Sequence, residues 1–90
     1  MPTVIHSGRI EKKAINLTVK FPVLFTTLPH VVITGHWDAS GQRGSIPGGV
    51  ERPDIIHAIT NSSFTVHSEN RTPTNGATYF IHWMARGNVP

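Results

Sequence analysis

The chain has 90 residues, no cysteine, and eight lysines and arginines against five acidic residues. This length fits a single small domain over residues 1–90, and the lack of cysteine excludes disulfide bonds and thiolate-bound metal as sources of stability. The basic residues are scattered, whereas nucleic-acid binding normally needs a denser basic face, so we expect no nucleic-acid partner. No apolar run approaches the ~20 residues that span a bilayer, and the N-terminal residues lack the apolar core of a signal peptide. We therefore expect a soluble chain without membrane insertion or a cleaved signal.

Apolar residues alternate with polar ones along most of the chain, which predicts half-buried strands. No segment shows a helical period over three turns. The predicted strands span, in chain order, residues 15–21, 31–33, 55–59, 64–68 and 78–87, with residues 3–7 as an additional short candidate. This pattern predicts an all-β fold, a small antiparallel β-sandwich of about six strands.

The connections between these strands carry turn signals. Residues 61–63 are few enough for a hairpin, and Asn75-Gly76 is a strong turn dipeptide. Residues 38–53 form the longest irregular stretch and are rich in glycine and proline. Irregular segments of this length are usually functional or mobile.

The last predicted strand is apolar on both faces. Its alternate positions place Tyr79, Ile81, Trp83 and Ala85 on one side. The other side carries Phe80, His82, Met84 and Arg86. A strand that faces solvent on one side should be polar there, so we expect oligomerisation to cover the second face.

Six histidines raise the question of a metal site, but no pair has the i, i+2 or i, i+4 spacing that would bring two imidazoles together. His57 and His67 flank a predicted turn and could lie on adjacent strands, in a register that the sequence leaves open. A three-fold axis could bring three copies of His82 together. We expect no metal and no cofactor.

Catalysis has little support in the sequence. Asp38, Glu51 and Asp54 bracket the long irregular stretch, so a carboxylate pair is geometrically possible. The alternative is that these are charges at the ends of the loop that accept backbone hydrogen bonds. No nucleophile elbow or triad order is present, and we expect the protein not to be an enzyme.

Planar polar and aromatic side chains, the types that recognise sugars, gather on two predicted loops, residues 37–43 and 69–75, which we expect at one end of the sandwich. Asp54 and Tyr79 share this chemistry, and Trp37 has the alternative role of closing the end of the sandwich. The candidate glycan-binding residues are Trp37, Asp38, Gln42, Arg43, Arg52, Glu69, Asn70 and Arg71.

Several short motifs are similar to those of known domains. They are Phe21-Pro22-x-x-Phe25, Leu28-Pro29-x-Val31-Val32, Phe64-Thr65-Val66 and Trp83-Met84-Ala85-Arg86-Gly87. Together they resemble the C-terminal tip domain of bacteriophage tail fibres, and their layout is similar to that of the six-stranded H-type lectin domain. The resemblance covers about residues 8–87.

The resemblance implies a homotrimer in which one sheet of each sandwich faces its neighbours, with Phe80, His82 and Met84 in the interface. It further implies a non-catalytic receptor-binding tip of a tail fibre or tailspike, part of the virion and made in the host cytoplasm. Such a tip would follow upstream fibre domains and bind host surface glycan, either lipopolysaccharide or capsule. Three weak sites on one rigid body would bind by avidity.

The sugar-binding motif of the H-type lectins is only partly matched. Thr74 matches that motif, Asp38 matches the acidic loop residue of the family, and Arg71 replaces its stacking tryptophan. The departure favours the tail-fibre interpretation over N-acetylgalactosamine binding. Two alternatives remain: a structural trimerisation cap without a receptor site, and a cellular H-type lectin.

Overall fold

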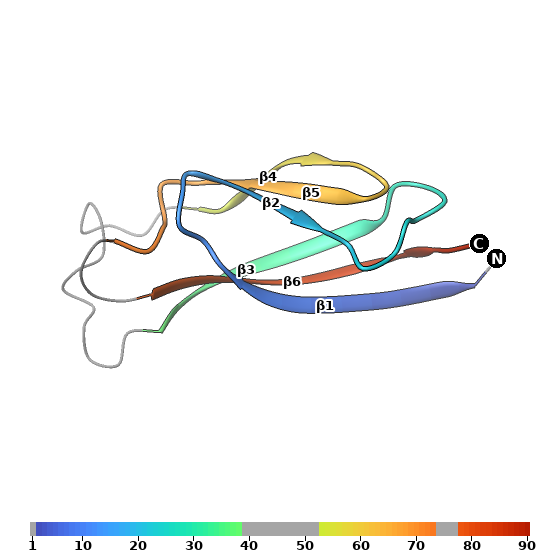
Figure 1. The fold of residues 1–90 in the computed structure, drawn as a ribbon, viewed down its shortest axis with the longest axis horizontal. Coiled ribbons are helices and arrows are strands. Elements are labelled where there is room, and N and C mark those ends of the chain that lie inside the picture. Colours follow the sequence, from blue (N-terminus) through green and yellow to red (C-terminus); the bar gives the residue numbers. More distant parts are fainter. Residues whose placement is uncertain (1, 39–52, 74–77) are drawn as a thin grey trace.

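The computed structural model describes residues 2–38, 53–73 and 78–90. The described residues form six strands and no helix (Figure 1). The strands are β1 (Thr3–Glu11), β2 (Asn16–Lys20), β3 (His30–Asp38), β4 (Ile55–Ile59), β5 (Ser63–His67) and β6 (Thr78–Asn88). No helix long and apolar enough to cross a membrane occurs in this part of the chain.

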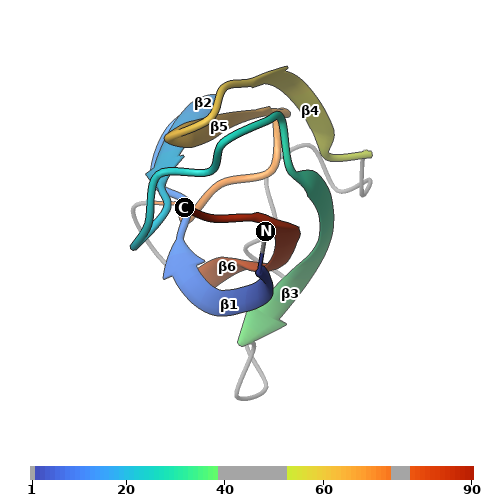
Figure 2. The same ribbon diagram turned by 90° about the vertical axis from the view of Figure 1, so that its right-hand side faces the viewer.

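The strands make two three-stranded antiparallel sheets, in the orders β1-β6-β3 and β2-β5-β4. Figure 2, which looks along the strands, shows the two sheets stacked face to face. The predicted antiparallel sandwich is confirmed. The hairpin predicted at residues 61–63 is also confirmed, because β4 and β5 are paired and the Thr60 amide donates to the Ser63 carbonyl at 2.8 Å.

The core lies between the two sheets and is built largely from aromatic rings. The Phe21 ring lies 5.1 Å from Phe25, 5.5 Å from Phe64 and 5.9 Å from Trp83, measured between centroids. Gly8 is opposite Trp83 in the ladder, and a Cβ there would come within 2.9 Å of the indole Nε1. The missing side chain therefore lets the tryptophan lie against β1. The buried apolar residues are Val19, Phe21, Phe25, Phe64, Val66, Tyr79, Ile81, Trp83 and Ala85.

Two strands are longer than the sequence predicted. β1 continues to Glu11 beyond the predicted residues 3–7, and β3 runs to Asp38 beyond the predicted residues 31–33. The added residues are mostly polar or glycine, so they lack the apolar alternation on which the prediction depended. They are strand because β6, which lies between them, supplies backbone partners on both of its edges.

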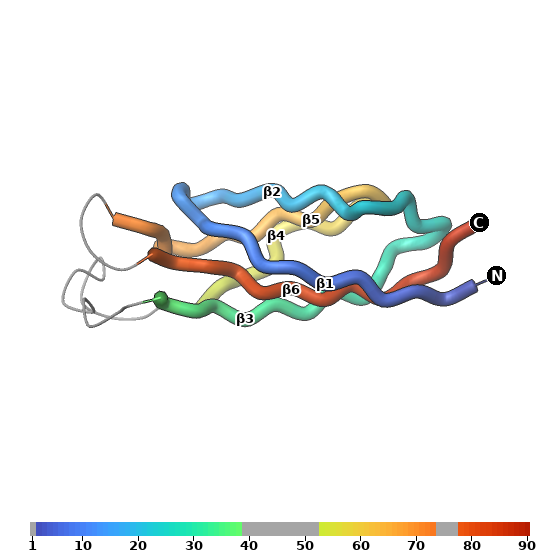
Figure 3. Tube along the Cα trace, turned by 60° about the horizontal axis from the view of Figure 1, so that its bottom comes forward, coloured from blue at the N-terminus to red at the C-terminus, as the bar shows by residue number. Residues whose placement is uncertain are grey.

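The sandwich has two distinct ends, 47 Å apart along its longest axis. Both termini lie at one end, which we call the terminal end (Figures 1 and 3). β3 ends and β6 begins at the opposite end, which we call the distal end. The described residues that flank segments 39–52 and 74–77 are at this distal end.

Candidate functional site

The outer face of the β1-β6-β3 sheet carries exposed apolar side chains. The ladder places Val32 of β3 directly beside Met84 of β6. Ile5 of β1 lies beside Arg86, the next residue of β6 whose side chain points outward. The exposed fractions are 64% for Val32, 60% for Ile5 and 47% for Met84. A hollow of about 240 Å³ lies here, lined in part by Val32, His82 and Met84. The three exposed residues form what we call the apolar patch.

The residues predicted to be covered by a neighbouring copy are on this face, but their surroundings differ. Met84 is exposed, whereas Phe80 and His82 are half-buried. The Arg9 guanidinium lies 4.5 Å from the centre of the Phe80 ring, and the His36 ring lies 5.4 Å from that of His82 in an edge-on arrangement. Neighbouring strands of the same chain thus already cover part of the face that the sequence left unexplained.

The outer face of the β2-β5-β4 sheet has a different character. The Thr18 and Thr65 hydroxyls are 3.0 Å apart, and the Asn16 Oδ1 lies 2.6 Å from the His67 Nδ1, so cross-strand pairs hydrogen bond to each other. Ile55 is exposed at its edge. This face has the polar side-chain pairs expected of a solvated sheet surface, which the outer face of the β1-β6-β3 sheet lacks at the apolar patch.

A buried polar cluster holds the distal end together, and sequence reasoning missed it. Lys12 is fully buried, and its ammonium donates to the carbonyls of Ala14 at 2.7 Å, Ser68 at 2.8 Å and Asn70 at 2.5 Å. An ammonium has three protons to donate, so all three are used. The backbone of Lys12 also bonds to both sides, since its amide donates to Tyr79 and its carbonyl accepts from Thr72.

Asp54 is the acidic centre of the same cluster. Its carboxylate accepts hydrogen bonds from the Ser68 hydroxyl at 2.6 Å and from the Tyr79 hydroxyl. Gly35 makes room for this arrangement, because a Cβ at that position would lie 2.6 Å from the Asp54 Oδ2 and would collide with the Tyr79 hydroxyl. The Asp54 carboxylate therefore bonds to side chains of the same chain, a structural role that the sequence analysis did not consider.

Burial has an electrostatic consequence for Lys12. Loss of water around the ammonium lowers its pKa from the ordinary 10.5, and the nearby Asp54 carboxylate partly opposes this shift. Arg71 adds to the lowering, and Glu69 opposes it. The lysine is thus held by hydrogen bonds in a place where its charge is poorly solvated.

The candidate glycan-binding residues fall into three groups. Glu69 and Arg71 form a partly exposed ion pair at 3.3 Å, and Asp38 is the exposed last residue of β3. Trp37 and Asn70 instead both contact Tyr79, the tryptophan through ring centroids 4.5 Å apart and the buried asparagine through a long 3.4 Å hydrogen bond. Gln42, Arg43, Arg52 and Thr74 lie outside the described residues.

The placement of Trp37 differs from the prediction that it belongs to a loop. Trp37 and Asp38 are the last two residues of β3, opposite Tyr79 and Thr78 of β6. Trp37 is half-buried and packs against the core, as the alternative interpretation of this residue stated. Sequence reasoning could have found this position from Val31, Ile33 and Trp37, which share one face of an extended strand.

Four of the six histidines form two pairs of neighbouring rings, His36 with His82 and His57 with His67. His57 and His67 do lie on adjacent strands, with ring centroids 6.2 Å apart. Among the described residues, no group of three histidine, cysteine, aspartate or glutamate side chains is arranged to hold a metal ion.

No known protein-family model matches this chain, and a search of curated proteins finds no related sequence.

Proposed function

We propose that this protein is the non-catalytic, receptor-binding tip of a phage tail fibre or tailspike, which acts as a homotrimer and binds host surface glycan. The exposed apolar patch of Ile5, Val32 and Met84 is the observation that carries the proposal. The short motifs shared with tail-fibre tip domains support the choice of three copies and of lipopolysaccharide or capsule as receptor.

The energetic case for association rests on the size of the apolar patch. Burying a fully exposed side chain of this kind is worth about 1.5–3 kcal/mol. With their exposed fractions of 64%, 60% and 47%, the three residues therefore contribute about 2.5–5 kcal/mol per chain, and every chain of the assembly contributes this amount again. A 90-residue domain without disulfides gains much from such burial.

The two ends of the molecule suit a fibre tip. The termini lie together at the terminal end, where upstream fibre domains would join, and the distal end is free to meet a cell surface (Figure 1). The partly exposed Arg71 and the exposed Asp38 and Glu69 supply planar polar groups at the distal end. Three such sites on one trimer would bind by avidity even when each is weak.

The structural trimerisation cap is a second candidate, and the inward placement of two predicted contact residues favours it. Trp37 packs on Tyr79, and Asn70 is buried in the polar cluster, so neither presents its side chain to a ligand. In this alternative the apolar patch has the same role, but the distal end binds nothing.

Association is tested by the native mass of the purified protein over a dilution series, measured by light scattering or native mass spectrometry. We expect a species of three chains that persists at micromolar concentration. Val32→Glu places a charge in the apolar patch and should give monomers. Thr18→Glu, the matched control on the outer face of the other sheet, should keep the mass of the wild type. A monomeric wild type at micromolar concentration contradicts the proposal.

Glycan binding is tested separately, by adhesion of the labelled protein to host cells. Arg71→Ala should weaken adhesion if the distal end binds glycan, while Lys20→Ala, at the exposed last residue of β2, serves as a control outside that site. Unchanged adhesion of the Arg71 variant, with an intact trimer, would reject the distal site and leave the cap as the better candidate.

A further inference from the structure

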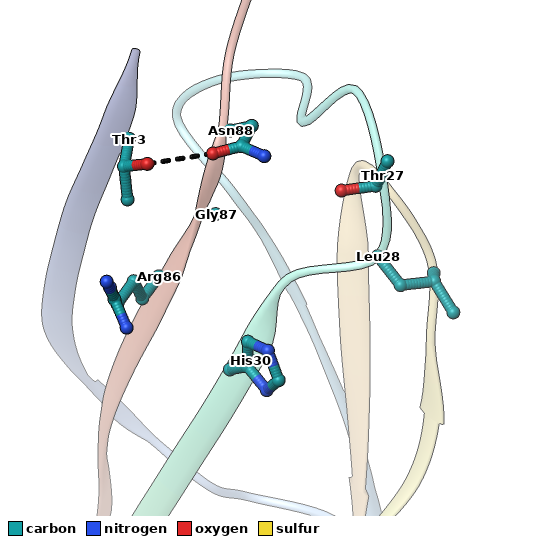
Figure 4. Close-up of a pocket in the computed structure, with 7 residues that line it drawn as sticks. All are labelled: Thr3, Thr27, Leu28, His30, Arg86, Gly87 and Asn88. Carbon is teal, nitrogen blue, oxygen red and sulfur yellow. Dashed lines mark hydrogen bonds between the residues drawn. The ribbon is translucent and has the colours of Figure 1, made fainter. Parts of the chain in front are cut away.

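The outer face of the β2-β5-β4 sheet has none of the roles proposed above. The trimer would cover the outer face of the other sheet, including the hollow of about 240 Å³ at the apolar patch. A hollow at the terminal end lies where upstream domains would join. Its side chains point in different directions, Arg86 toward β1 and Leu28 away from His30 (Figure 4). The outer face of the β2-β5-β4 sheet is therefore the one that would stay open to solvent in the trimer.

Two histidines meet on this face because β4 carries a bulge. Ile56 pairs with Val66 and Ala58 with Thr65, so the register shifts at His57. A bulge adds one residue to a strand and changes the direction of its side chains. Ile59 therefore packs against the core while His57 and Ala58 are both exposed.

The second histidine, His67, is the exposed last residue of β5, and Asn16 of β2 holds its ring. The Asn16 Oδ1 lies 2.6 Å from the His67 Nδ1. An amide oxygen only accepts, so Nδ1 carries the proton and donates it, and the other nitrogen of the neutral ring, Nε2, keeps its lone pair. Histidines that bind metal ions almost always donate their second ring N–H in this way, which fixes the orientation of the ring. His67 is thus prepared to bind a metal ion through Nε2.

The spacing of the two rings suits one metal ion between them. Zinc lies about 2.0–2.1 Å from an imidazole nitrogen, so two rings that share an ion have centres about 4.5–6.5 Å apart, depending on the angle between the bonds. The centres of the His57 and His67 rings are 6.2 Å apart, at the wide end of this range. Because His57 is exposed, its ring can turn toward the tetrahedral angle that zinc prefers.

The charge of the neighbouring β2 strand does not oppose a cation at this position. Lys20 shares the outer face of β2 with Asn16, but it pairs with Ser63 at the other end of the strand. Four residues of strand separate Lys20 from Asn16, a distance of about 13 Å. At physiological ionic strength the Debye length is about 8 Å, so the repulsion of the ammonium is largely screened.

We propose that His57 and His67 bind a divalent transition-metal ion of the zinc class, with Asn16 as the positioning residue for His67. Imidazole nitrogen suits zinc, nickel and copper ions, whereas magnesium and calcium prefer oxygen ligands. Two protein ligands leave two of the four positions of a tetrahedral ion open to water or to a further ligand from outside the chain. The site is independent of the proposed trimer contact and of the distal glycan site.

The proposal is tested by NMR titration of the isotope-labelled whole chain, without an affinity tag, with zinc chloride. We expect saturable shifts of the His57 and His67 ring signals, and none with magnesium chloride. His57→Gln should weaken zinc binding at least tenfold. Asn16→Ala should weaken it by about tenfold or more, and Asn16→Asp, which restores an acceptor for the His67 Nδ1–H, should keep the affinity of the wild type. All three residues are exposed, so the variants should keep the fold, which the unchanged remainder of each spectrum checks.

His36→Gln is the matched control, because the exposed His36 is also one of a pair of neighbouring rings, with its centre 5.4 Å from that of His82 on the other sheet. It should leave zinc binding unchanged. Loss of binding in His36→Gln but not in His57→Gln would move the ion to the other pair and overturn the proposal. Equal zinc affinity of the wild type and His57→Gln, or equal shifts with magnesium, would also overturn it. The native mass of the protein is measured separately, so a monomeric protein would end the trimer proposal without deciding this one.

Discussion

Replacing Lys12 with methionine tests whether the buried polar cluster stabilises the distal end. Methionine keeps most of the aliphatic length of lysine and removes the ammonium. The carbonyls of Ser68 and Asn70 would then be left buried without their donor, whereas the partly exposed Ala14 carbonyl can turn to water. We expect the variant to lose stability because both carbonyls lose their short hydrogen bonds from the ammonium.

The expected loss follows from the cost of unpaired buried groups. Each buried acceptor that loses its partner costs about 1–3 kcal/mol, which gives about 2–6 kcal/mol for two carbonyls. Small domains have a total stability of about 5–15 kcal/mol, so the variant would lose a large part of it. Asp54 would also lose its electrostatic interaction with the Lys12 ammonium, an effect in the same direction.

Urea unfolding followed by tryptophan fluorescence measures this loss, at equal chain concentration for every variant. With a slope of about 1–2 kcal/mol per molar urea, a loss of 2 kcal/mol lowers the midpoint by about 1–2 M. Lys13→Met is the matched control, because Lys13 is exposed and should change stability by less than about 0.5 kcal/mol. A Lys12→Met midpoint equal to that of the Lys13 variant would refute the structural role of the ammonium.

Two further predictions concern the same cluster. Because the folded state lowers the pKa of Lys12, it binds that proton more weakly than the unfolded chain does, so the wild type should gain stability over Lys12→Met as the pH rises from neutral toward 10.5. A shrinking difference in unfolding free energy over that range would contradict the direction of the pKa shift. Gly35→Ala should cost about 1–3 kcal/mol, because the new methyl group would push the Tyr79 hydroxyl away from Asp54. Urea midpoints check this against Thr34→Ala, whose exposed side chain makes it a neutral control, and equal midpoints would show that the cluster adapts without cost.

Much of the sheet architecture could be predicted because side chains in a strand alternate strictly between two faces. In β6 this rule put Tyr79, Ile81 and Trp83 on one face and Met84 on the other, and in the structure the first three are buried and Met84 is exposed. Pairing between strands was harder to predict. β1 and β3 are extended along polar stretches by hydrogen bonds to β6, and no local pattern in Thr34 or Gly35 records those bonds.

The buried cluster could not be read from the sequence for a related reason. Lysine is among the residues least often buried, so Lys12 carries a local signal for the surface. Its acceptors at Ser68 and Asn70 are 56 and 58 residues away along the chain. Only the fold brings these groups together.

The pairing of β1 with β6 has a mechanical consequence. These two strands carry the chain ends side by side, with the Val89 amide donating to the Pro2 carbonyl at 3.0 Å and Thr3 opposite Asn88. A force that pulls the two ends apart would load this ladder one rung at a time and peel it open from Val89 inward. A force that pulls both chain ends in the same direction, while the distal end is held fixed, would run along the strands and load many rungs at once. The same domain is therefore weak against separation of its ends and strong along its length.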